Sequence, residues 1–509
     1  MEYNLSKQTV STCEIFLDTV NEQLVDADIT LPDYCPDIEK ILKCSLDVKV
    51  YTRHISGGQL TIDGVSLIKI LYCDSVRHNL RSYDTTVPFT CSFNLKSTPE
   101  QYIIFSDTKC EYMNCRALSP RKMVIHGAFS LSAKVLSKGT REYFGKADEW
   151  DLQTKTRELV VSDMCALTQE QFSFTEDIEV SNKSVESLLS YDVSSNIKEL
   201  KPLHNKLMLS ADVTFKALYL CDLDSGETEH ISYVFPLSRI IDCDCVTDEV
   251  IAVPTLEIMS SDIHTKHDSM SDKTTLMVDL KISFSSLCYA EKTIDVIEDA
   301  YSTEYETDIK AESKLAQCNH SCVEFSNISK STFDFGNIKI SKIIDVACES
   351  LSLAPVFLEQ KLTVCGKVTY SIIACDNEDT PVYIERSAEL SISPNIDREY
   401  KNATLKNACV QSISFRIVDD NSIELRTEIK GMLSLCDEKT YPCVTAVTCE
   451  QERRVSHSDC ALVLYFADEG ENVWDIAKHY RTKQNLLAEE NSLSNTVLST
   501  SCMLLVPTE

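Results

Sequence analysis

Apolar and polar residues alternate along three separate segments of the chain. At 423–435, for example, Glu424 and Arg426 alternate with Ile423 and Leu425, so that one face is apolar and the other is charged. A period of two with one polar face is typical of a half-buried antiparallel strand. The segments are MVIHGAFSLSAKV (123–135), LMVDLKISF (276–284) and IELRTEIKGMLSL (423–435), and their predicted buried residues are Met123, Ile125, Phe129, Leu131, Ala133, Val135, Leu276, Val278, Leu280, Ile282, Phe284, Ile423, Leu425, Ile429, Leu433 and Leu435.

Two other elements recur with each alternating segment. A strand-like run ends three times in a Cys-Asp pair, and a short apolar run precedes it each time. These are IDGVSLIKILYCD (62–74, with Cys73), LSADVTFKALYLCD (209–222, with Cys221) and TVCGKVTYSIIACD (363–376, with Cys375), preceded by IEKIL (38–42), VESLL (185–189) and ISKII (340–344). The nearly equal spacing indicates three copies of one β-rich domain. We expect a first repeat with its N-terminal segment at 1–160, a second at 161–315 and a third at 316–450.

The pattern changes after a polar linker predicted at 451–459. An apolar strand, ALVLYFA, is followed by NVWDIAKHY, whose apolar residues recur with the period of a helix face, and Asn472 can cap that helix. A second short helix over TKQNLLAEEN and a closing strand, CMLLVP, complete a β-α-α-β domain at 460–509. The predicted fold is therefore mainly β, with three tandem β-rich repeats followed by this small domain. The first helix face comprises Val473, Ile476, Ala477 and Tyr480.

The charge of the chain narrows the classes of partner. Lysine and arginine number 49 against 79 aspartates and glutamates, which gives a net charge of −30. Such a chain repels phosphate backbones and anionic lipids, so we expect neither nucleic-acid binding nor direct membrane insertion. No run approaches the ~20 apolar residues that span a bilayer, and no signal peptide is visible. We therefore expect the 23 cysteines to be free thiols in a reducing cytoplasm.

Four short motifs contain residue types that occur in catalytic or metal sites. CNHSC (318–322) has metal-ligand types, but no second pair stands at zinc-site spacing. HTKH (264–267) lacks a following glutamate, and the two thiols of CDC (243–245) share one strand face. GGQLTIDG (57–64) lacks the Lys-Ser/Thr of a phosphate loop. We predict no enzymatic activity, no metal site and no cofactor.

LPDYCPDIEKIL (31–42), followed by SPRKMVIHGAF (119–129), resembles the SPOCS domain of spore coat morphogenetic proteins. The first repeat carries this resemblance best, and the second and third diverge from it. The residues themselves predict an extended, stiffened approach at Pro32 and Pro36, with Asp37 as the cap of a short helix that follows.

The C-terminal domain resembles a LysM domain. Its loops depart from that pattern, because residues 470–473 read GENV where Gly-Asp-Thr-Leu is usual, and TSC at 500–502 lacks a glycine. In glycan-binding members these two loops line a groove for N-acetylglucosamine polymers. The resemblance thus implies a candidate glycan groove at Gly470, Glu471, Asn472 and Asn491. The matching residues are Gly470, Trp474, Ile476, Ala477, Tyr480, Leu487, Asn491 and the closing LLVP.

One face of the first strand of this domain has no evident partner. Leu462, Leu464 and Phe466 lie opposite the face that the helices can cover. Together with Trp474 they predict an apolar protein-binding patch. Two alternatives stay open: the face packs on the preceding repeat, or Trp474 fills the core of the domain.

SPOCS-like repeats followed by a LysM-like domain resemble the SipL/SpoVID class of spore morphogenetic proteins. That resemblance implies a non-enzymatic sporulation scaffold in the mother-cell cytoplasm, at the forespore surface. It further implies binding to the coat morphogenetic ATPase SpoIVA through the LysM domain, with other coat proteins as further partners. The alternative function is binding of peptidoglycan or its lipid-linked precursor through N-acetylglucosamine.

Overall fold

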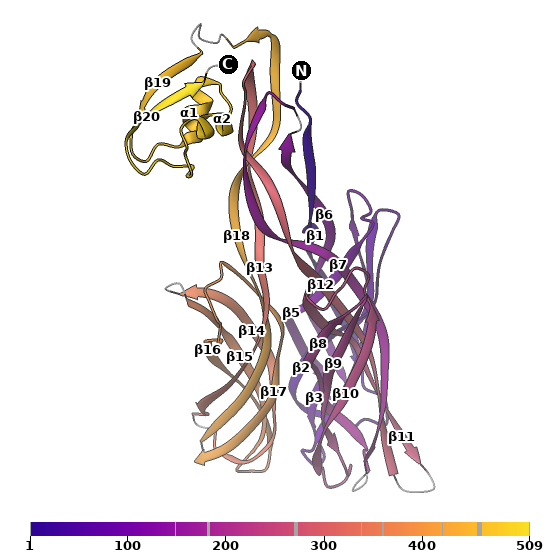
Figure 1. The fold of residues 1–509 in the computed structure, drawn as a ribbon. Helices are drawn as coiled ribbons and strands as arrows, with labels where there is room; N and C mark the ends of the chain where they lie inside the picture. Colours follow the sequence, from indigo (N-terminus) through magenta and orange to yellow (C-terminus); the bar gives the residue numbers. More distant parts are fainter. Residues whose placement is uncertain are drawn as a thin grey trace.

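The computed structural model shows three β-sandwiches in succession and a small C-terminal domain (Figure 1). Strands make up nearly all of the regular structure, so the prediction of a mainly β chain is confirmed. The two described helices have 8 and 7 residues, and neither could cross a bilayer. The structure describes residues 2–147, 149–180, 184–268, 273–336, 338–358, 361–419, 421–455 and 461–507.

Each sandwich, called a unit below, uses six strands. Unit 1 consists of β1 (Leu5–Thr30), β2 (Ile38–Ser56), β3 (Gln59–Asp74), β4 (Leu80–Asn94), β5 (Tyr102–Ser119) and β6 (Lys122–Ala147). Unit 2 consists of β7 (Leu152–Val180), β8 (Ser187–Leu203), β9 (Lys206–Leu220), β10 (Thr228–Asp242), β11 (Ile251–Asp268) and β12 (Lys273–Ser302). Unit 3 consists of β13 (Tyr305–Asp334), β14 (Ile340–Leu358), β15 (Lys361–Asp376), β16 (Pro381–Ile392), β17 (Asn402–Asp419) and β18 (Ser422–Arg454).

The six strands of a unit form two antiparallel sheets. The first, sixth and fifth strands make the outer sheet, in the orders β1-β6-β5, β7-β12-β11 and β13-β18-β17. The second, third and fourth strands make a meander, called the inner sheet below. The two sheets of a unit enclose one hydrophobic core. The boundaries expected after residues 160, 315 and 450 lie inside β7, β13 and β18, because the outer strands run far beyond the alternating segments.

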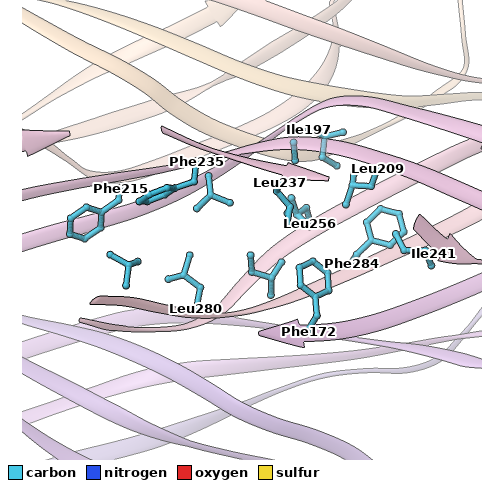
Figure 2. Close-up of a cluster of buried hydrophobic side chains, with 14 of the residues drawn as sticks. Phe172, Ile197, Leu209, Phe215, Phe235, Leu237, Ile241, Leu256, Leu280 and Phe284 are labelled. Carbon is cyan, nitrogen blue, oxygen red and sulfur yellow. The ribbon is translucent and has the colours of Figure 1, made fainter. Parts of the chain in front are cut away.

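The alternating segments are the central strands of the outer sheets. Every residue predicted on their apolar faces is at most 3% exposed. In unit 2, Phe215 and Phe235 of the inner sheet lie across the core from Leu280 and Phe172 of the outer sheet (Figure 2). The period of two therefore predicted both the strand and its buried face.

The Cys-Asp pairs mark the turn after the third strand of each unit. Asp74, Asp222 and Asp376 each accept a hydrogen bond from the backbone N–H two residues ahead, at 3.1, 2.8 and 2.9 Å. Such Asx turns explain why aspartate recurs at this position. The cysteines do not share one environment. Cys221 lies in the core of unit 2, whereas Cys73 donates to a backbone carbonyl of unit 3.

The LPDYCPD segment leads into a strand, and the prediction of a helix after Asp37 is wrong. β2 begins at Ile38, and the Asp37 carboxylate accepts a hydrogen bond from the Arg121 guanidinium at 2.8 Å. The same guanidinium donates to three carbonyl oxygens of the segment at distances of 3.1, 3.2 and 2.6 Å. Arg121 thus joins the two motifs that carry the SPOCS resemblance.

The three inner sheets close into a ring. β4 meets β8, where the Ser82 hydroxyl donates to the Leu188 carbonyl oxygen at 2.6 Å. β10 meets β14 through an imidazole–carboxylate contact of 3.1 Å. β16 meets β2, where the Lys43 ammonium lies 5.2 Å from the centre of the Tyr383 ring.

Apolar residues from all three units meet inside this ring. The short runs IEKIL, VESLL and ISKII contribute their last residues, Leu42, Leu189 and Ile344, to one cluster. The repetition of these runs therefore has a physical reason, because each inner sheet needs an apolar residue on the side that faces away from its own sandwich. The cluster also contains Leu71, Leu80, Leu218, Leu220 and Ile373.

The first and sixth strands of each unit continue beyond the sandwiches and combine into a stalk (Figure 1). Two clusters of buried residues, each drawn from all three units, stabilise it. One cluster comprises Tyr3, Leu5, Leu152, Ile297, Ala300, Val444, Val447 and Cys449, and the other comprises Val10, Tyr143, Leu159, Val161, Ile294, Val296, Ala316 and Cys443.

His320 is buried where units 2 and 3 meet. It lies at a bulge of β13 and stacks on Tyr289 of β12, with ring centres 3.8 Å apart. Neither ring nitrogen has a hydrogen-bond partner among the described residues. Burial lowers the pKa of His320 to about 4, so the ring is neutral near pH 7 and acts as packing surface.

The C-terminal domain has the predicted order of elements. It consists of β19 (Leu462–Ala467), α1 (Val473–Tyr480), α2 (Gln484–Glu490) and β20 (Cys502–Pro507), with β19 antiparallel to β20. Asn472 caps α1, because its side-chain oxygen accepts from the Trp474 N–H at 2.9 Å. Of the expected linker, residues 451–454 belong to β18 and residues 456–459 lie outside the described residues.

Arg121→Ala should loosen the segment at 31–37. We expect a local loss of about 1–2 kcal/mol, because several carbonyl oxygens and a carboxylate lose a charged donor. Arg121→Lys should restore little, since an ammonium cannot reach these acceptors with the geometry of a guanidinium. Hydrogen exchange measured by mass spectrometry should show faster exchange in peptides covering this segment. Arg116→Ala, at an exposed position on β5, is the control. Equal exchange in the Arg121→Ala and Arg116→Ala variants would contradict the role of Arg121 in holding the segment at 31–37.

His320→Phe should flatten the pH dependence of stability. The unfolded imidazole has a pKa of 6.5 and the folded one a pKa of about 4, so only the unfolded state gains a proton between these values. The wild type should therefore lose about 2 kcal/mol on going from pH 7.5 to pH 5. The phenylalanine variant keeps the stack on Tyr289 and loses this component. Urea unfolding at the two pH values measures this loss of stability, and His54→Gln, at an exposed position, is the control. The same loss of stability in the wild type and in His320→Phe would refute the assignment.

Candidate functional site

β19 and β20 present one apolar face to solvent, called the open face below. Leu464 and Phe466 are 66% and 65% exposed, and Met503, which pairs with Phe466, is 63% exposed. Leu462 and Leu505 are also exposed and lie on the same face. A continuous apolar surface of this kind on a small domain is typical of a protein-binding site.

The other face of this sheet is covered by the two helices. Val463 and Tyr465 of β19 pack with Leu504 and Val506 of β20 into a core with the helices. A two-stranded sheet has two faces and the helices cover one, so the other is left to solvent. Among the described residues, no segment of the preceding units covers the open face.

Trp474 lies away from the open face. Its ring is 3% exposed and packs edge-on against Tyr301 of β12, with ring centres 4.9 Å apart. Its indole N–H donates to Asp299 of β12 at 2.9 Å, and the Lys478 ammonium contacts both oxygens of that carboxylate at 2.6 and 2.7 Å. The Tyr301 hydroxyl donates to the Thr482 carbonyl oxygen at 2.6 Å. The structure therefore does not bring Trp474 together with Leu462, Leu464 and Phe466.

These contacts, called the dock below, attach the C-terminal domain to the stalk. Figure 1 shows the two helices on the stalk side and the two strands on the far side. A register shift between Ile297 and Asp299 interrupts the pairing of β12 with β7 just before the dock. Such a bulge re-aims the residues that follow it, here Asp299 and Tyr301.

Asp299 is the charged centre of the dock. Burial raises its pKa, but hydrogen bonds from Lys478 and Trp474 outweigh that effect and hold the pKa below its usual value of 3.8. The carboxylate is therefore ionised at neutral pH and attracts Lys478. No local feature of the sequence indicated this role, since acidic residues occur throughout the chain.

The residues of the candidate glycan groove have roles inside the domain. Asn472 caps α1, and the Tyr465 hydroxyl donates to both carboxylate oxygens of Glu471 at 3.0 and 3.1 Å. Asn491 binds the Leu505 backbone, donating to its carbonyl oxygen at 2.7 Å and accepting from its N–H at 2.7 Å. Gly470 supplies a backbone φ of 90°, which suits glycine. Their side chains serve the fold of the domain.

A cavity of about 970 Å³ lies between the three units. The Lys69 ammonium of unit 1 lies 3.7 Å from the ring centre of Tyr191 in unit 2. Lys216 donates to a backbone carbonyl of unit 3 at 2.9 Å, and burial raises the pKa of nearby Asp192. Lysines, carboxylates and apolar side chains are mixed in its wall, so the wall favours no single class of ligand. The sequence could not reveal this cavity, because it forms only when three units assemble.

Metal-ligand types do not converge in the described parts of the chain, where no group of three or more is placed to hold an ion. In the CNHSC motif, His320 stacks on Tyr289 instead of meeting the two thiols.

The comparison with family models bears on unit 1. Residues 37–118 match the family model described as SipL, SPOCS domain, and this range covers β2 to β5. Unit 1 therefore contains a SPOCS domain, and this match supports a SipL/SpoVID-like SPOCS protein. A search of curated proteins and a search of solved structures returned no match.

A SPOCS domain suggests a sporulation-related coat protein, and the SPOCS family is a structural, sporulation-related family and not a known family of enzymes. The match begins at Asp37, which Arg121 binds. It includes the whole inner sheet of unit 1 and the edge strand of its outer sheet. Units 2 and 3 have the same strand order as this SPOCS unit.

Asp299→Asn should weaken the dock of the SPOCS protein. The substitution removes the charge that holds Lys478 but leaves an oxygen for the Trp474 N–H. We expect a loss of about 1–2 kcal/mol, because a half-buried ion pair loses one charge. In a Trp150→Phe background, the emission of Trp474 should move to longer wavelength as water reaches the indole.

Asp295→Asn is the matched control for this experiment. Asp295 lies on the same strand and makes a more distant contact, 4.0 Å, with Lys146. Its substitution should leave the emission unchanged. Equal spectra for both variants would rule out Asp299 as the centre of the dock.

Proposed function

We propose that this SPOCS protein is a non-enzymatic scaffold of spore coat assembly. In this proposal it binds the coat morphogenetic ATPase SpoIVA through its LysM-like C-terminal domain, and so localises the coat around the forespore. It acts in the mother-cell cytoplasm at the forespore surface, with other coat proteins as further partners.

The open face is the observation that carries the proposal. Leu462, Leu464 and Phe466 pair across the sheet with Pro507, Leu505 and Met503, so every position on this face is apolar. Covering apolar surface contributes roughly 25 cal/mol per Å². Aromatic residues and methionine are enriched at the centres of protein interfaces. A sugar polymer would instead require polar groups aimed outward, and the polar groups of the candidate groove are bound within the domain.

Trp474 supports partner binding indirectly in this proposal. Its ring and N–H are engaged by Tyr301 and Asp299, so it fixes the domain with the open face turned away from the stalk. Units 1 to 3 then act as an acidic spacer. Many copies of the protein at one surface bind by avidity even if each contact is weak.

Leu464→Glu should reduce capture of SpoIVA by at least about tenfold. A glutamate at the centre of the open face would carry a charge into an interface that offers it no partner. The measurement is equilibrium binding of purified SpoIVA to the full-length protein, after circular dichroism has shown that the variant is folded.

Leu486→Glu provides the matched control. Leu486 is an exposed leucine of the same domain, but it lies on α2, away from the open face. Its substitution introduces the same charge and should leave SpoIVA capture close to the wild-type level. Equal capture of SpoIVA by the wild type, Leu464→Glu and Leu486→Glu would refute the open face as the binding site. An equal loss of capture in the two variants would refute a specific role of the open face.

A further inference from the structure

The backbone of β19 has one paired edge and one free edge. Among the described residues, β20 is its only partner in the sheet. The directions of its backbone groups follow from Asn491, which lies on the other side of β20. The Asn491 amide donates to the Leu505 carbonyl oxygen and accepts from the Leu505 N–H, both at 2.7 Å. Both backbone groups of Leu505 therefore point away from β19.

The pairing register extends this result to β19. Opposite residues of an antiparallel pair alternate between those that exchange backbone hydrogen bonds and those whose N–H and C=O groups point outward. Leu464 lies opposite Leu505, so its N–H and C=O point to the free edge of β19. By the same alternation, so do those of Leu462 and Phe466. These are the residues whose side chains form the β19 half of the open face.

The outer edge of β20 is closed by contrast. Asn491 occupies the backbone groups of Leu505, and Pro507 has no N–H to offer. Proline is tolerated in a strand where its missing N–H would face away from the neighbouring strand, and Pro507 meets this condition two residues after Leu505. An added strand would therefore find its hydrogen-bond partners along β19 and not along β20.

We propose that the partner of the open face adds an extended strand to the free edge of β19, an inference that rests on the proposed function. An unpaired strand edge is a template for another strand, in which backbone hydrogen bonds give affinity and alternate side chains give specificity. Leu462, Leu464 and Phe466 supply the backbone groups, and the added strand continues the open face with its own apolar side chains. A segment as long as β19, 6 residues, is sufficient.

Charge favours a partner segment over a second copy of this chain. A second copy would bring another net charge of −30 to this edge. Asp468 and Glu469 follow β19 directly, and both are exposed. A cationic residue at the end of an apolar strand would meet these carboxylates favourably. The occupant is therefore an extended segment of the partner that is apolar at alternate positions and basic at one end.

Leu464→Pro tests the backbone contact. Proline removes the N–H that points to the free edge, whereas the hydrogen bonds between β19 and β20 do not use that group. Leu464→Val is the matched control, because it keeps both the N–H and an apolar side chain. After circular dichroism has shown that both full-length variants are folded, we expect purified SpoIVA to bind Leu464→Pro at least about tenfold more weakly than Leu464→Val.

Hydrogen exchange in the complex of the wild type with SpoIVA provides a measurement that needs no variant. Exchange resolved to single amides should slow at Leu464 and Phe466 on binding, because these amides gain a hydrogen-bond partner. The amides of Val463 and Tyr465 point toward β20 and should change little.

The outcomes separate this inference from the proposed function. If Leu464→Glu loses capture while Leu464→Pro binds as well as Leu464→Val, the open face remains the binding site and strand addition is overturned. Unchanged exchange at the edge amides overturns it as well. A dimer of the free protein that Leu464→Pro dissociates would assign the edge to a second copy instead.

The basic end of the added strand has its own test. Asp468→Asn combined with Glu469→Gln should weaken SpoIVA capture by about threefold at low salt, since exposed ion pairs contribute little each. This difference should disappear at high salt because the charges are then screened. Equal capture by this double variant and the wild type at low salt would overturn the basic end.

Discussion

The stalk depends on burial of apolar side chains that no single unit can cover. The inner strands have 12 to 19 residues, whereas the first and sixth strands of the units have 26 to 33. The additional length extends past each sandwich as a two-stranded ribbon with apolar positions on one side. Three such ribbons together form a closed core, and each contributes residues to both stalk clusters. The three units therefore share common cores in the stalk and are not independent domains joined by linkers.

Charge makes the packing of the units more specific. In a chain with a net charge of −30, contacts between units tend to bring like charges together. Cationic residues at the contacts between units 1 and 2 offset this repulsion. Arg53, almost fully buried, contacts Glu257 at 2.7 Å, and Lys49 contacts Asp262 at 2.8 Å. Burial raises the pKa of Glu257 even beside Arg53, so this pair contributes more to the register of the units than to stability.

Local periodicity predicted much of the fold, and long-range contacts account for what it missed. The buried faces of the central strands and the exposure of Leu464 follow from alternation within a few residues. The helix expected after Asp37 does not form, because the residues from Ile38 onward pair with β3 as a strand. The Asp37 carboxylate instead binds Arg121, 84 positions away. Cys221 carries the same local motif as Cys73 but turns toward the core of its own unit. Trp474 and Asp299 lie 175 positions apart, so only the folded chain brings them together.

The dock and the open face are consequences of one geometric limit. A domain with two short helices and a two-stranded sheet buries one face of that sheet and keeps the other in solvent. Its helical side supplies polar and aromatic groups, and these match the Asp299 and Tyr301 side chains of the stalk. Once that side is attached, the remaining surface is the apolar sheet face, directed away from the stalk. In the proposed function, Trp474 therefore acts through the orientation of the domain, and the strand residues Leu462, Leu464 and Phe466 make the contact with the partner.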